Sequence, residues 1–473
     1  MFIGREHELE IIKKAIASNV PELGVVYGRR RVGKSMLLQE TGGRKGDLYF
    51  EALQDTSSKL QIEHFLNQLA EQTGAPRAAA KDWREAFDAL SFYLDKGRHY
   101  VVFDEFPWMA AGRNALTSLF KYYWDNRWKK NSGLTMVLCG SVANFMFKHI
   151  VHSKALHNRK TFEIKLRPLP AHEAKQFFKD YRSDFEIARF LMVFGGIPKY
   201  LEQLDPRRSL GDNLDRLCFQ RNSFFLTEFE TIFKEQFKVT KTYEQIVSKL
   251  AGQSYSRETL ARRLKMKPGG GLTGYIRNLE QADFVRVFKP MSVTGRGERT
   301  RRVVLWDEWL RFYFTFVEPN RSIIELNSKP GMFEQLASRS FEPYCGLAFE
   351  RLCMKNLPSI LARLNIGLHQ VVGYGPFFRQ PGRKSRRRTE GLQIDILVQR
   401  KGDVLTLIEC KFRSRPIGVS VIREVEQKIK LLKAPSRFSI ERVLLCAGET
   451  TSDLEGSGYF HEIVGLESVF SPL

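Results

Sequence analysis

Gly28-Arg29-Arg30-Arg31-Val32-Gly33-Lys34-Ser35 is the stretch that decides the fold of this chain. It matches the pattern G-x-x-x-x-G-K-[ST], follows the short apolar run 23–27 and precedes an apolar helical pattern that begins at Met36. This order of strand, loop and helix is what a phosphate-binding loop requires. The glycines let backbone N–H groups surround an anion, Lys34 can reach terminal phosphates, and the Ser35 hydroxyl can bind Mg²⁺. The pattern therefore predicts a nucleotide site.

The composition of the chain favours a polyanionic partner. The chain has 473 residues, enough for several domains, with a formal net charge of +22 and a sequence pI near 9.7. Such an excess of Lys and Arg is typical of nucleic-acid-binding proteins, with a basic soluble enzyme as the alternative. The six cysteines show no C-x-x-C spacing, and no apolar run approaches membrane-spanning length. We therefore expect a cytoplasmic protein with reduced thiols, no zinc site and no membrane segment.

Two further apolar runs end in residues that suit a nucleotide site. Residues 99–103 have a strand pattern that is closed by Asp104 and Glu105. We expect Asp104 to hold Mg²⁺ and Glu105 to orient or deprotonate the attacking water. A third strand pattern, 134–138, leads to Ser141, which either senses the γ-phosphate at the strand end or caps a following helix.

The order of these motifs resembles the archaeal-type P-loop ATPase family, which is similar to the AAA+ and STAND-like ATPases. The resemblance covers residues 1–235 and also rests on Phe2-Ile-Gly-Arg-Glu6, Arg167-Pro168-Leu169 and Gly196-Ile197-Pro198. It implies an ATPase core with a helical lid that places Pro198 against the base. Arg159 is a candidate for stabilising charge on the transferred phosphate, with a solvated arginine as the alternative. The residues expected to bind ATP are Gly28, Arg29, Arg30, Arg31, Val32, Gly33, Lys34, Ser35, Ser141 and Pro198.

The middle segment, residues 236–320, has the pattern of a winged helix-turn-helix module. Helical patterns at 243–250, 256–264 and 272–281 precede strand patterns at 284–289 and 301–306, which flank the turn 294–297. Members of the resembled family often carry such a module. As a DNA reader it would place its third helix in the major groove, and the alternative is a domain that contacts protein. The candidates for contact with DNA are Arg262, Arg263, Arg277 and Arg302.

The C-terminal segment, residues 335–473, follows a linker predicted around Pro330-Gly331 and contains acidic residues inside apolar strands. The hairpin pattern 392–398 and 404–412 carries Asp395, Glu409 and Lys411, and the preceding helical pattern 341–355 carries Glu350. Glu409 and Lys411 are two residues apart, so both project from one face of a strand. An acid within an apolar strand costs stability unless it binds a metal or finds a partner.

This arrangement resembles the PD-(D/E)-x-K superfamily of restriction-endonuclease-like nucleases, although Ile394 stands where the superfamily has proline. The resemblance implies that Asp395, Glu409 and Glu350 bind Mg²⁺ and that Lys411 lies beside the attacked phosphate. The alternative is an edge hairpin with outward charges. Glu-x-Lys also occurs at Glu163–Lys165, Glu173–Lys175 and Glu426–Lys428, without this hairpin context. A basic run adds Arg386, Arg387 and Arg388 as candidates for contact with DNA.

Together these patterns predict an α/β protein with three modules: a P-loop AAA+-like ATPase core, a winged helix-turn-helix and an α/β restriction-endonuclease-like domain. The expected function is ATP-regulated binding and Mg²⁺-dependent cutting of nucleic acid, chiefly double-stranded DNA, in defence or mobile-element control. The alternative is a STAND-like signalling ATPase whose C-terminal fold binds nucleic acid or partners without cutting. Assembly into a homo-oligomer is compatible with either function.

Overall fold

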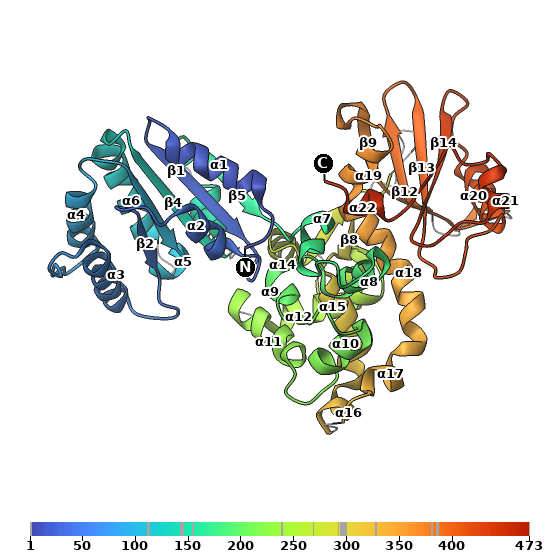
Figure 1. The fold of residues 1–473 in the computed structure, drawn as a ribbon, viewed down its shortest axis with the longest axis horizontal. Helices are drawn as coiled ribbons and strands as arrows, with labels where there is room; N and C mark the ends of the chain where they lie inside the picture. The colour runs from blue at the N-terminus through green and yellow to red at the C-terminus, as the bar shows by residue number, and fades with distance from the viewer. Residues whose placement is uncertain are drawn as a thin grey trace. The chain divides into compact units, whose positions relative to one another are not determined.

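The computed structural model describes residues 2–110, 114–141, 146–153, 156–237, 240–267, 269–291, 293, 300–326, 329–379, 382–384 and 387–472. The chain divides into two compact units, each containing a five-stranded sheet (Figure 1). Unit 1 comprises residues 1–168, 232–240 and 281–283, and unit 2 comprises residues 169–231, 241–280 and 284–473. No helix in these described ranges is long and apolar enough to cross a membrane.

Unit 1 is built on a sheet whose strands are all parallel. The strands are β1 (Glu22–Gly28), β2 (Leu48–Glu51), β3 (His99–Asp104), β4 (Leu134–Ser141) and β5 (Phe162–Leu166). Their order is β2-β3-β4-β1-β5, so the carboxyl ends of all five strands lie at one edge of the sheet. The strands predicted at 99–103 and 134–138 and the α/β class of this part of the chain are confirmed.

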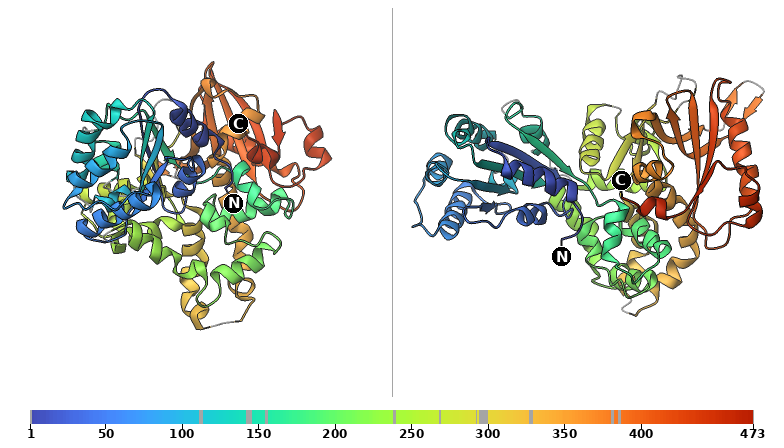
Figure 2. Two further views of the ribbon diagram at one scale, coloured as in Figure 1. Left: turned by 60° about the vertical axis from the view of Figure 1, so that its left-hand side comes forward. Right: turned by 45° about the horizontal axis from the view of Figure 1, so that its top comes forward.

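Helices cover both faces of this sheet (Figures 1 and 2). They are α1 (Glu6–Ala17), α2 (Lys34–Thr41), α3 (Ser58–Thr73), α4 (Trp83–Tyr93), α5 (Phe106–Met109), α6 (Asn114–Asn126), and the short helices η1 (Trp128–Lys130) and η2 (Met146–Val151). On one face α1 contacts β4, where the Thr135 hydroxyl donates to the Ala15 carbonyl at 3.1 Å. On the other face α3, α4 and α6 share one apolar core with the strands.

Aromatic rings fill the core beneath α3, α4 and α6. The centroid of Phe103 on β3 lies 5.6 Å from that of Phe120, and Phe87 lies 5.2 Å from Trp128. Burial of each such ring contributes roughly 1.5–3 kcal/mol to stability. Apolar contact therefore holds the sheet between its helices, while the strand ends remain free to carry polar side chains.

Unit 2 begins with helices that the sequence analysis assigns to the ATPase core. They are α7 (Ala171–Ala174), η3 (Lys175–Phe177), α8 (Asp184–Phe194), α9 (Pro198–Leu201), α10 (Leu210–Cys218) and the first part of α11 (Phe224–Gln236). They pack against later segments of unit 2, since the Tyr344 hydroxyl donates to the Met192 carbonyl and Phe194 stacks on Trp309. This shared burial explains why residues 169–231 belong to unit 2 and not to unit 1. The module boundaries at 235, 320 and 335 stay predictions.

The helices and strands expected in the middle segment are present. They are α12 (Thr240–Gly252), β6 (Tyr255–Ser256), α13 (Arg257–Arg263), α14 (Gly270–Gln281), β7 (Val285–Phe288) and β8 (Arg302–Leu305). Three antiparallel strands form a sheet of order β6-β8-β7. Ser256 caps α13, because its hydroxyl oxygen accepts the Thr259 N–H at 3.1 Å. The predicted turn 294–297 lies outside the described residues.

In the described residues, five short helices follow the small sheet, and the last two flank Pro330-Gly331, where a linker was expected. They are α15 (Glu308–Phe312), η4 (Tyr313–Val317), η5 (Glu318–Asn320), α16 (Arg321–Leu326) and α17 (Met332–Leu336). The Asp215 carboxylate accepts the Gly331 N–H at 2.7 Å and the Phe333 N–H at 3.1 Å. Phe333 also lies 5.7 Å from Phe219, between ring centroids. The linker prediction at Pro330-Gly331 is therefore wrong, because a distant carboxylate and an apolar contact hold this segment on α10.

The last part of unit 2 is a mixed sheet with helices. Its helices are α18 (Ser338–Lys355), α19 (Leu357–Arg363), η6 (Leu368–Gln370), α20 (Ser420–Leu432), α21 (Ser452–Gly456) and α22 (Glu467–Phe470). Its strands are β9 (Val371–Arg379), β12 (Leu392–Arg400), β13 (Val404–Lys411), β14 (Ser439–Cys446), β15 (Glu462–Val464) and the separate hairpin β10 (Gly382–Lys384) and β11 (Arg387–Thr389).

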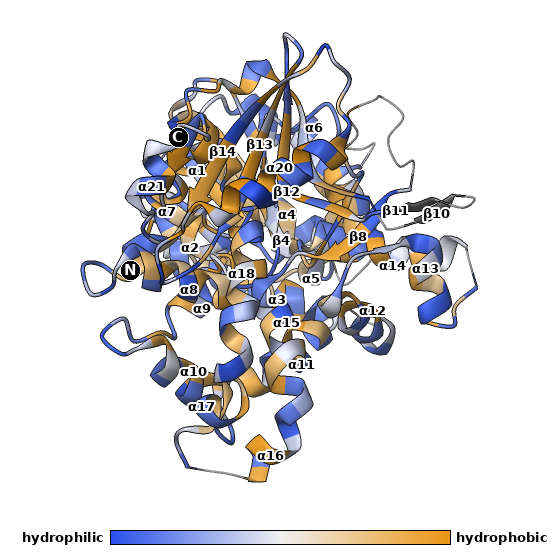
Figure 3. Ribbon diagram, turned by 90° about the vertical axis from the view of Figure 1, so that its right-hand side faces the viewer, coloured by the Kyte–Doolittle hydropathy of each residue, from blue (hydrophilic) through white to orange (hydrophobic). Residues whose placement is uncertain are grey.

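The order of the mixed sheet is β15-β14-β13-β12-β9. β9, β12 and β13 are antiparallel neighbours, whereas β13, β14 and β15 are parallel. The central strands are largely hydrophobic (Figure 3), and Leu405, Leu407 and Leu444 share a core with Val421 and Val425 of α20. The hairpin predicted at 392–412 and the helix predicted at 341–355 are confirmed.

Replacement of Gly28 by alanine is expected to destabilise unit 1 by about 1–3 kcal/mol, because an added methyl would overpack the sheet. A Cβ at Gly28 would lie 2.3 Å from the Leu166 carbonyl oxygen on β5. Gly42→Ala is the matched control, since its Cβ would meet Tyr100 at an ordinary 3.5 Å. Urea unfolding of the two variants measures the difference, and equal midpoints would contradict the steric argument.

Candidate active sites

The loop between β1 and α2 is a sharp turn that leads directly into the helix. Arg31 and Gly33 have positive φ angles of 71° and 90°, which reverse the chain before the helix begins at Lys34. The Lys34 side chain is buried, and its Nζ donates to the Arg29 carbonyl at 3.2 Å and to Ser141 Oγ at 3.4 Å. The lysine is thus directed across the mouth of the loop, where an anion bound at the helix N-terminus would lie.

The end of β3 places Asp104 beside this loop. Its carboxylate is 1% exposed, and Oδ2 accepts the Ser35 hydroxyl at 2.5 Å and the Tyr49 hydroxyl at 2.5 Å. Oδ1 accepts the Glu105 N–H at 2.8 Å. Burial, followed by the charge of Asp104, raises the pKa of Tyr49 well above its usual value, so the phenol stays a donor. Ser35 and Asp104 offer oxygen atoms only, which fits Mg²⁺.

Glu105 points to the end of β4. Ser141 Oγ donates to one of its carboxylate oxygens at 2.8 Å, and the Ser141 N–H lies 3.3 Å from the other. Glu105 itself adopts a left-handed backbone with φ of 49°. The structure therefore brings together Lys34, Ser35, Asp104, Glu105 and Ser141, all of which the sequence analysis assigned to one nucleotide site.

The other candidates for this site lie differently. Arg29 and Val32 are buried, and Arg30 pairs with Glu235 at 3.2 Å. Arg159 forms a two-pronged ion pair with Asp125 of α6, at 2.6 and 2.7 Å, so its guanidinium is already engaged. Pro198 is the first residue of α9 in unit 2. The roles of Arg159 and Pro198 at the nucleotide stay predictions.

A second group of charged side chains lies in the mixed sheet of unit 2. Glu409 on β13 is 1% exposed, and Lys411 lies 3.0 Å from its Oε1, which confirms that the two residues share a face. Asp395 on β12 is 7% exposed, and its Oδ2 accepts the Cys410 N–H at 2.9 Å. An edge hairpin with outward charges does not describe these carboxylates, because both are buried in the central strands.

A further lysine, Lys428 of α20, reaches the same carboxylates. Its Nζ lies 2.7 and 2.6 Å from the two oxygens of Glu409 and 4.0 Å from Asp395 Oδ1. Glu424, one turn earlier on α20, accepts from Lys411 at 2.7 Å. The sequence analysis dismissed the pattern Glu426–Lys428 as a chance match, and the structure places its lysine at the buried site.

Glu350 of α18 completes this acidic group. Burial, and next the charge of Asp395, raises the pKa of Glu350 to about 8, while burial and Glu409 raise that of Asp395 to about 6. The Gln393 side chain donates to Glu350 at 3.3 Å. The oxygen-only donor set has the chemistry that Mg²⁺ takes. In the described part of the chain, however, no three acidic, His or Cys side chains stand in position to hold a metal ion.

The arginines predicted to contact DNA differ in how exposed their side chains are. Arg262 and Arg263 of α13 and Arg277 of α14 are exposed. Arg302 on β8 is partly buried: its guanidinium donates to Ser254 Oγ and O and lies 4.6 Å from the Phe378 ring centroid. Arg302 thus links segments within unit 2, which disfavours the predicted contact with phosphate. Arg386 lies outside the described residues, and Arg387 and Arg388 belong to β11.

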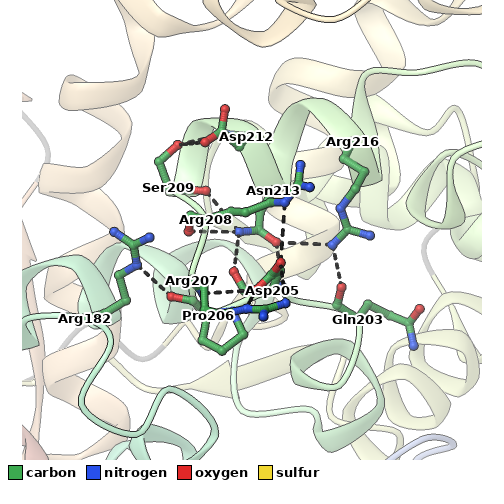
Figure 4. A network of polar contacts seen from close by, with 10 residues as sticks. All are labelled: Arg182, Gln203, Asp205, Pro206, Arg207, Arg208, Ser209, Asp212, Asn213 and Arg216. Atoms are coloured by element: carbon green, nitrogen blue, oxygen red, sulfur yellow. Dashed lines mark hydrogen bonds and ion pairs between the residues drawn. The ribbon is translucent and has the colours of Figure 1, made fainter.

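Figure 4 shows a polar network in and around the loop between α9 and α10. This loop and Arg216 also line an open surface pocket of about 470 Å³. Asn213 accepts the Asp205 N–H and donates to the Asp205 carbonyl, both at 2.9 Å. Arg207 and Arg208 pair with the Asp205 carboxylate, and Arg216 donates to the Gln203 carbonyl at 2.8 Å. These contacts hold the loop in place, and none of the predicted site residues takes part in them.

Residues 2–204 match the model of a family described as an ATPase domain predominantly from Archaea. The match includes the loop, the Asp104–Glu105 strand end and Ser141. Residues 2–204 are an ATPase domain of this family. A second model, described as Archaea bacterial proteins of unknown function, matches residues 313–428, which include all the charged residues of the second group.

The chain is also similar to two curated proteins and to a solved structure. An uncharacterized protein of Methanocaldococcus jannaschii is 27% identical over 359 residues, 76% of this chain and 77% of that protein. An uncharacterized ATP-binding protein of the same organism is 45% identical over 40 residues, 8% of this chain and 68% of that protein. The structure of a Walker-type ATPase of Pyrococcus abyssi superposes with a TM-score of 0.47 and 18% identity, over 66% of this chain and 96% of that protein.

Two residues of the ATPase domain had no role in the sequence analysis. Tyr49 holds Asp104 from β2, and no motif marks it because β2 is only four residues long. Arg5, in the opening motif, donates from Nη2 to the Val32 carbonyl at 3.2 Å and to the Arg167 carbonyl at 2.6 Å. The sequence analysis used both motifs that contain Arg5 and Arg167. It could not predict their contact, because the two residues are 162 positions apart in the chain.

Lys34→Ala is expected to abolish ATP hydrolysis and weaken nucleotide binding, because it removes the cation at the loop. Glu105→Gln should bind ATP and lose turnover by roughly 10²-fold or more, because the metal ligand Asp104 remains while the base is lost. Fluorescent-nucleotide titration and phosphate release measure the two effects, with the exposed Lys45→Ala as control. Normal turnover of Glu105→Gln would remove Glu105 from the catalytic role.

Proposed function

We propose that this P-loop ATPase acts on nucleic acid and that its second charged group is a nuclease site. The observation that carries the proposal is the burial of Asp395 and Glu409, 7% and 1% exposed, beside Lys411. Buried carboxylates cost stability unless they serve chemistry or find partners. Two acids and a lysine on neighbouring strands are the groups that phosphodiester hydrolysis needs.

The chain's own residues have distinct parts in this reaction. Water oxygen bonds to phosphorus, the bridging oxygen leaves, and a proton of the water passes to the leaving oxygen. Burial acts to lower the pKa of Lys411, but the nearby carboxylates of Glu409 and Glu424 have the larger combined effect. The pKa of Lys411 therefore lies above its usual value. Lys411 is therefore charged and suited to face the attacked phosphate. Asp395, Glu409 and Glu350 would hold Mg²⁺ only after their side chains move into ligating position, since they do not stand there now. The ion would neutralise charge and activate a water.

Exposed cations support nucleic acid as the substrate class. In the described residues of α13, of the loop after it and of α14, the side chains of Arg262, Arg263, Lys265, Lys267 and Arg277 are exposed. The net charge of +22 adds a long-range attraction for phosphates. Double-stranded DNA is the partner that suits three helices with a small antiparallel sheet, because such a module can place one helix in the major groove.

A second candidate is a signalling ATPase whose C-terminal fold binds without cutting. One observation favours it: the ammonium of Lys428 takes both oxygens of Glu409. A permanent counter-ion of this kind would stabilise the fold and leave no cation site. In that case the nucleotide state of unit 1 would control partner binding.

Asp395→Asn, Glu409→Gln and Lys411→Met are each expected to abolish Mg²⁺-dependent plasmid cleavage and to leave ATP turnover largely unchanged. The reason is that the two sites lie in different units of the chain. Asp453→Asn, an exposed acid on α21, is the matched control and should cut like wild type. Cleavage is followed on gels with and without ATP. Wild-type protein that hydrolyses ATP but never cuts DNA would favour the signalling candidate.

DNA binding is expected to weaken steeply with salt, since each phosphate contact contributes about −0.9 to the slope of log K against log salt. Arg262→Ala with Arg263→Ala should reduce that slope by about one unit per lost contact. Arg77→Ala with Lys81→Ala, two exposed cations of unit 1, serves as the charge-matched control. Fluorescence anisotropy at several salt concentrations gives the slopes, and identical slopes for the two double variants would exclude α13 from the interface.

A further inference from the structure

Lys428 is placed at the buried site by the geometry of α20. Glu424 and Lys428 are four residues apart, so they lie on one face of the helix. That face contacts β13, where Glu424 pairs with Lys411 and Lys428 pairs with Glu409. The result is a chain of alternating charges, Glu424–Lys411–Glu409–Lys428, with separations of 2.7, 3.0 and 2.6 Å.

The acids in this region outnumber the cations beside them, but Glu350, with a pKa of about 8, is largely neutral at pH 7, so the charges are close to balance. Four acids, Glu350, Asp395, Glu409 and Glu424, face the ammonium groups of Lys411 and Lys428 and the Arg351 guanidinium. Removal of one ammonium would therefore leave an excess of negative charge at the site. A hard divalent cation with oxygen ligands is the species that such an excess attracts.

The two lysines are anchored unequally. Lys411 bridges two carboxylates, Glu409 at 3.0 Å and Glu424 at 2.7 Å, whereas the close contacts of Lys428, at 2.7 and 2.6 Å, are both with Glu409, and Asp395 lies 4.0 Å away. Lys428 is also 22% exposed, and its four-carbon stem is flexible, so its head can turn to water. When a second cation competes for Glu409, Lys428 is therefore the group that can leave.

We propose that Lys428 is an internal cation that competes with a divalent metal for Glu409 and keeps the site closed until the metal displaces it. This inference rests on the nuclease site proposed above. It explains why acids with the chemistry of a metal site do not stand in ligating position among the described residues. The ammonium occupies the oxygens that the metal would take, and metal binding would free Lys428 to meet a phosphate.

The test is a calorimetric titration of nucleotide-free, full-length protein with MgCl₂. Lys428→Met keeps most of the side-chain stem and removes the charge. It should bind Mg²⁺ on the order of tenfold more tightly than wild type, because a like charge leaves a partly buried site. Lys430→Met, an exposed lysine on the same helix, should match wild type. Asp395→Asn should remove the heat of Mg²⁺ binding, and this loss would assign the binding to this site.

The outcomes separate the two proposals. If wild type shows Asp395-dependent Mg²⁺ binding and Lys428→Met binds Mg²⁺ equally or less tightly, competition by Lys428 is overturned and the nuclease site stands. If neither protein binds Mg²⁺ through Asp395, the nuclease site is overturned and the inference falls with it.

Thermal unfolding gives a second readout that needs no activity. Without Mg²⁺, Lys428→Met should melt below wild type, because Glu409 then shares Lys411 with Glu424. Saturating Mg²⁺ should raise the Tm of Lys428→Met by more than that of wild type, since tighter binding to the folded state stabilises it more. Equal shifts in Tm would contradict competition at Glu409.

Discussion

Parallel pairing of β1 with β4, and of β4 with β3, is the constraint on which the ATPase centre depends. It puts three strand ends side by side, and each end supplies different chemistry: a lysine in a loop after β1, two acids at the end of β3, and the Ser141 hydroxyl at the end of β4. If one strand ran the other way, its functional end would lie a strand length away, about 20 Å for six residues. The distances of 2.5–2.8 Å around Asp104 follow from this topology and from the aromatic core beneath it.

In unit 2 the corresponding constraint is the burial of charge. An ion without a partner inside a protein costs several kcal/mol, so acids in central strands need cations close by. Strand β13 supplies one lysine itself, and α20 supplies another from a different part of the chain. This mutual compensation ties α20 to the sheet by charge as well as by the apolar contacts of Val421 and Val425. It also means that the same ion pairs serve both the fold and the proposed chemistry.

Sequence patterns predicted what is local and missed what the fold assembles. The loop 28–35, the Asp104–Glu105 pair and the hairpin with Asp395 and Glu409 were recognisable because strand period and motif spacing are short-range. Tyr49 could not be found, since only the pairing of β2 with β3 brings its hydroxyl to Asp104. The Glu426–Lys428 pattern looked like a chance match, because only the packing of α20 on β13 brings Lys428 to Glu409. Glycine at 331 suggested a linker, but the Asp215 carboxylate, 116 residues earlier in the chain, accepts the Gly331 N–H and holds this segment on α10.

The contacts of Arg5 bear on the stability of the phosphate-binding loop. Its guanidinium joins the Val32 carbonyl in the phosphate loop to the Arg167 carbonyl just beyond β5, and the side chain is 4% exposed. Arg5 therefore braces the phosphate-binding loop against the end of β5. A change that displaces Arg5 would loosen the phosphate-binding loop while leaving the loop sequence 28–35 and the Asp104–Glu105 pair intact.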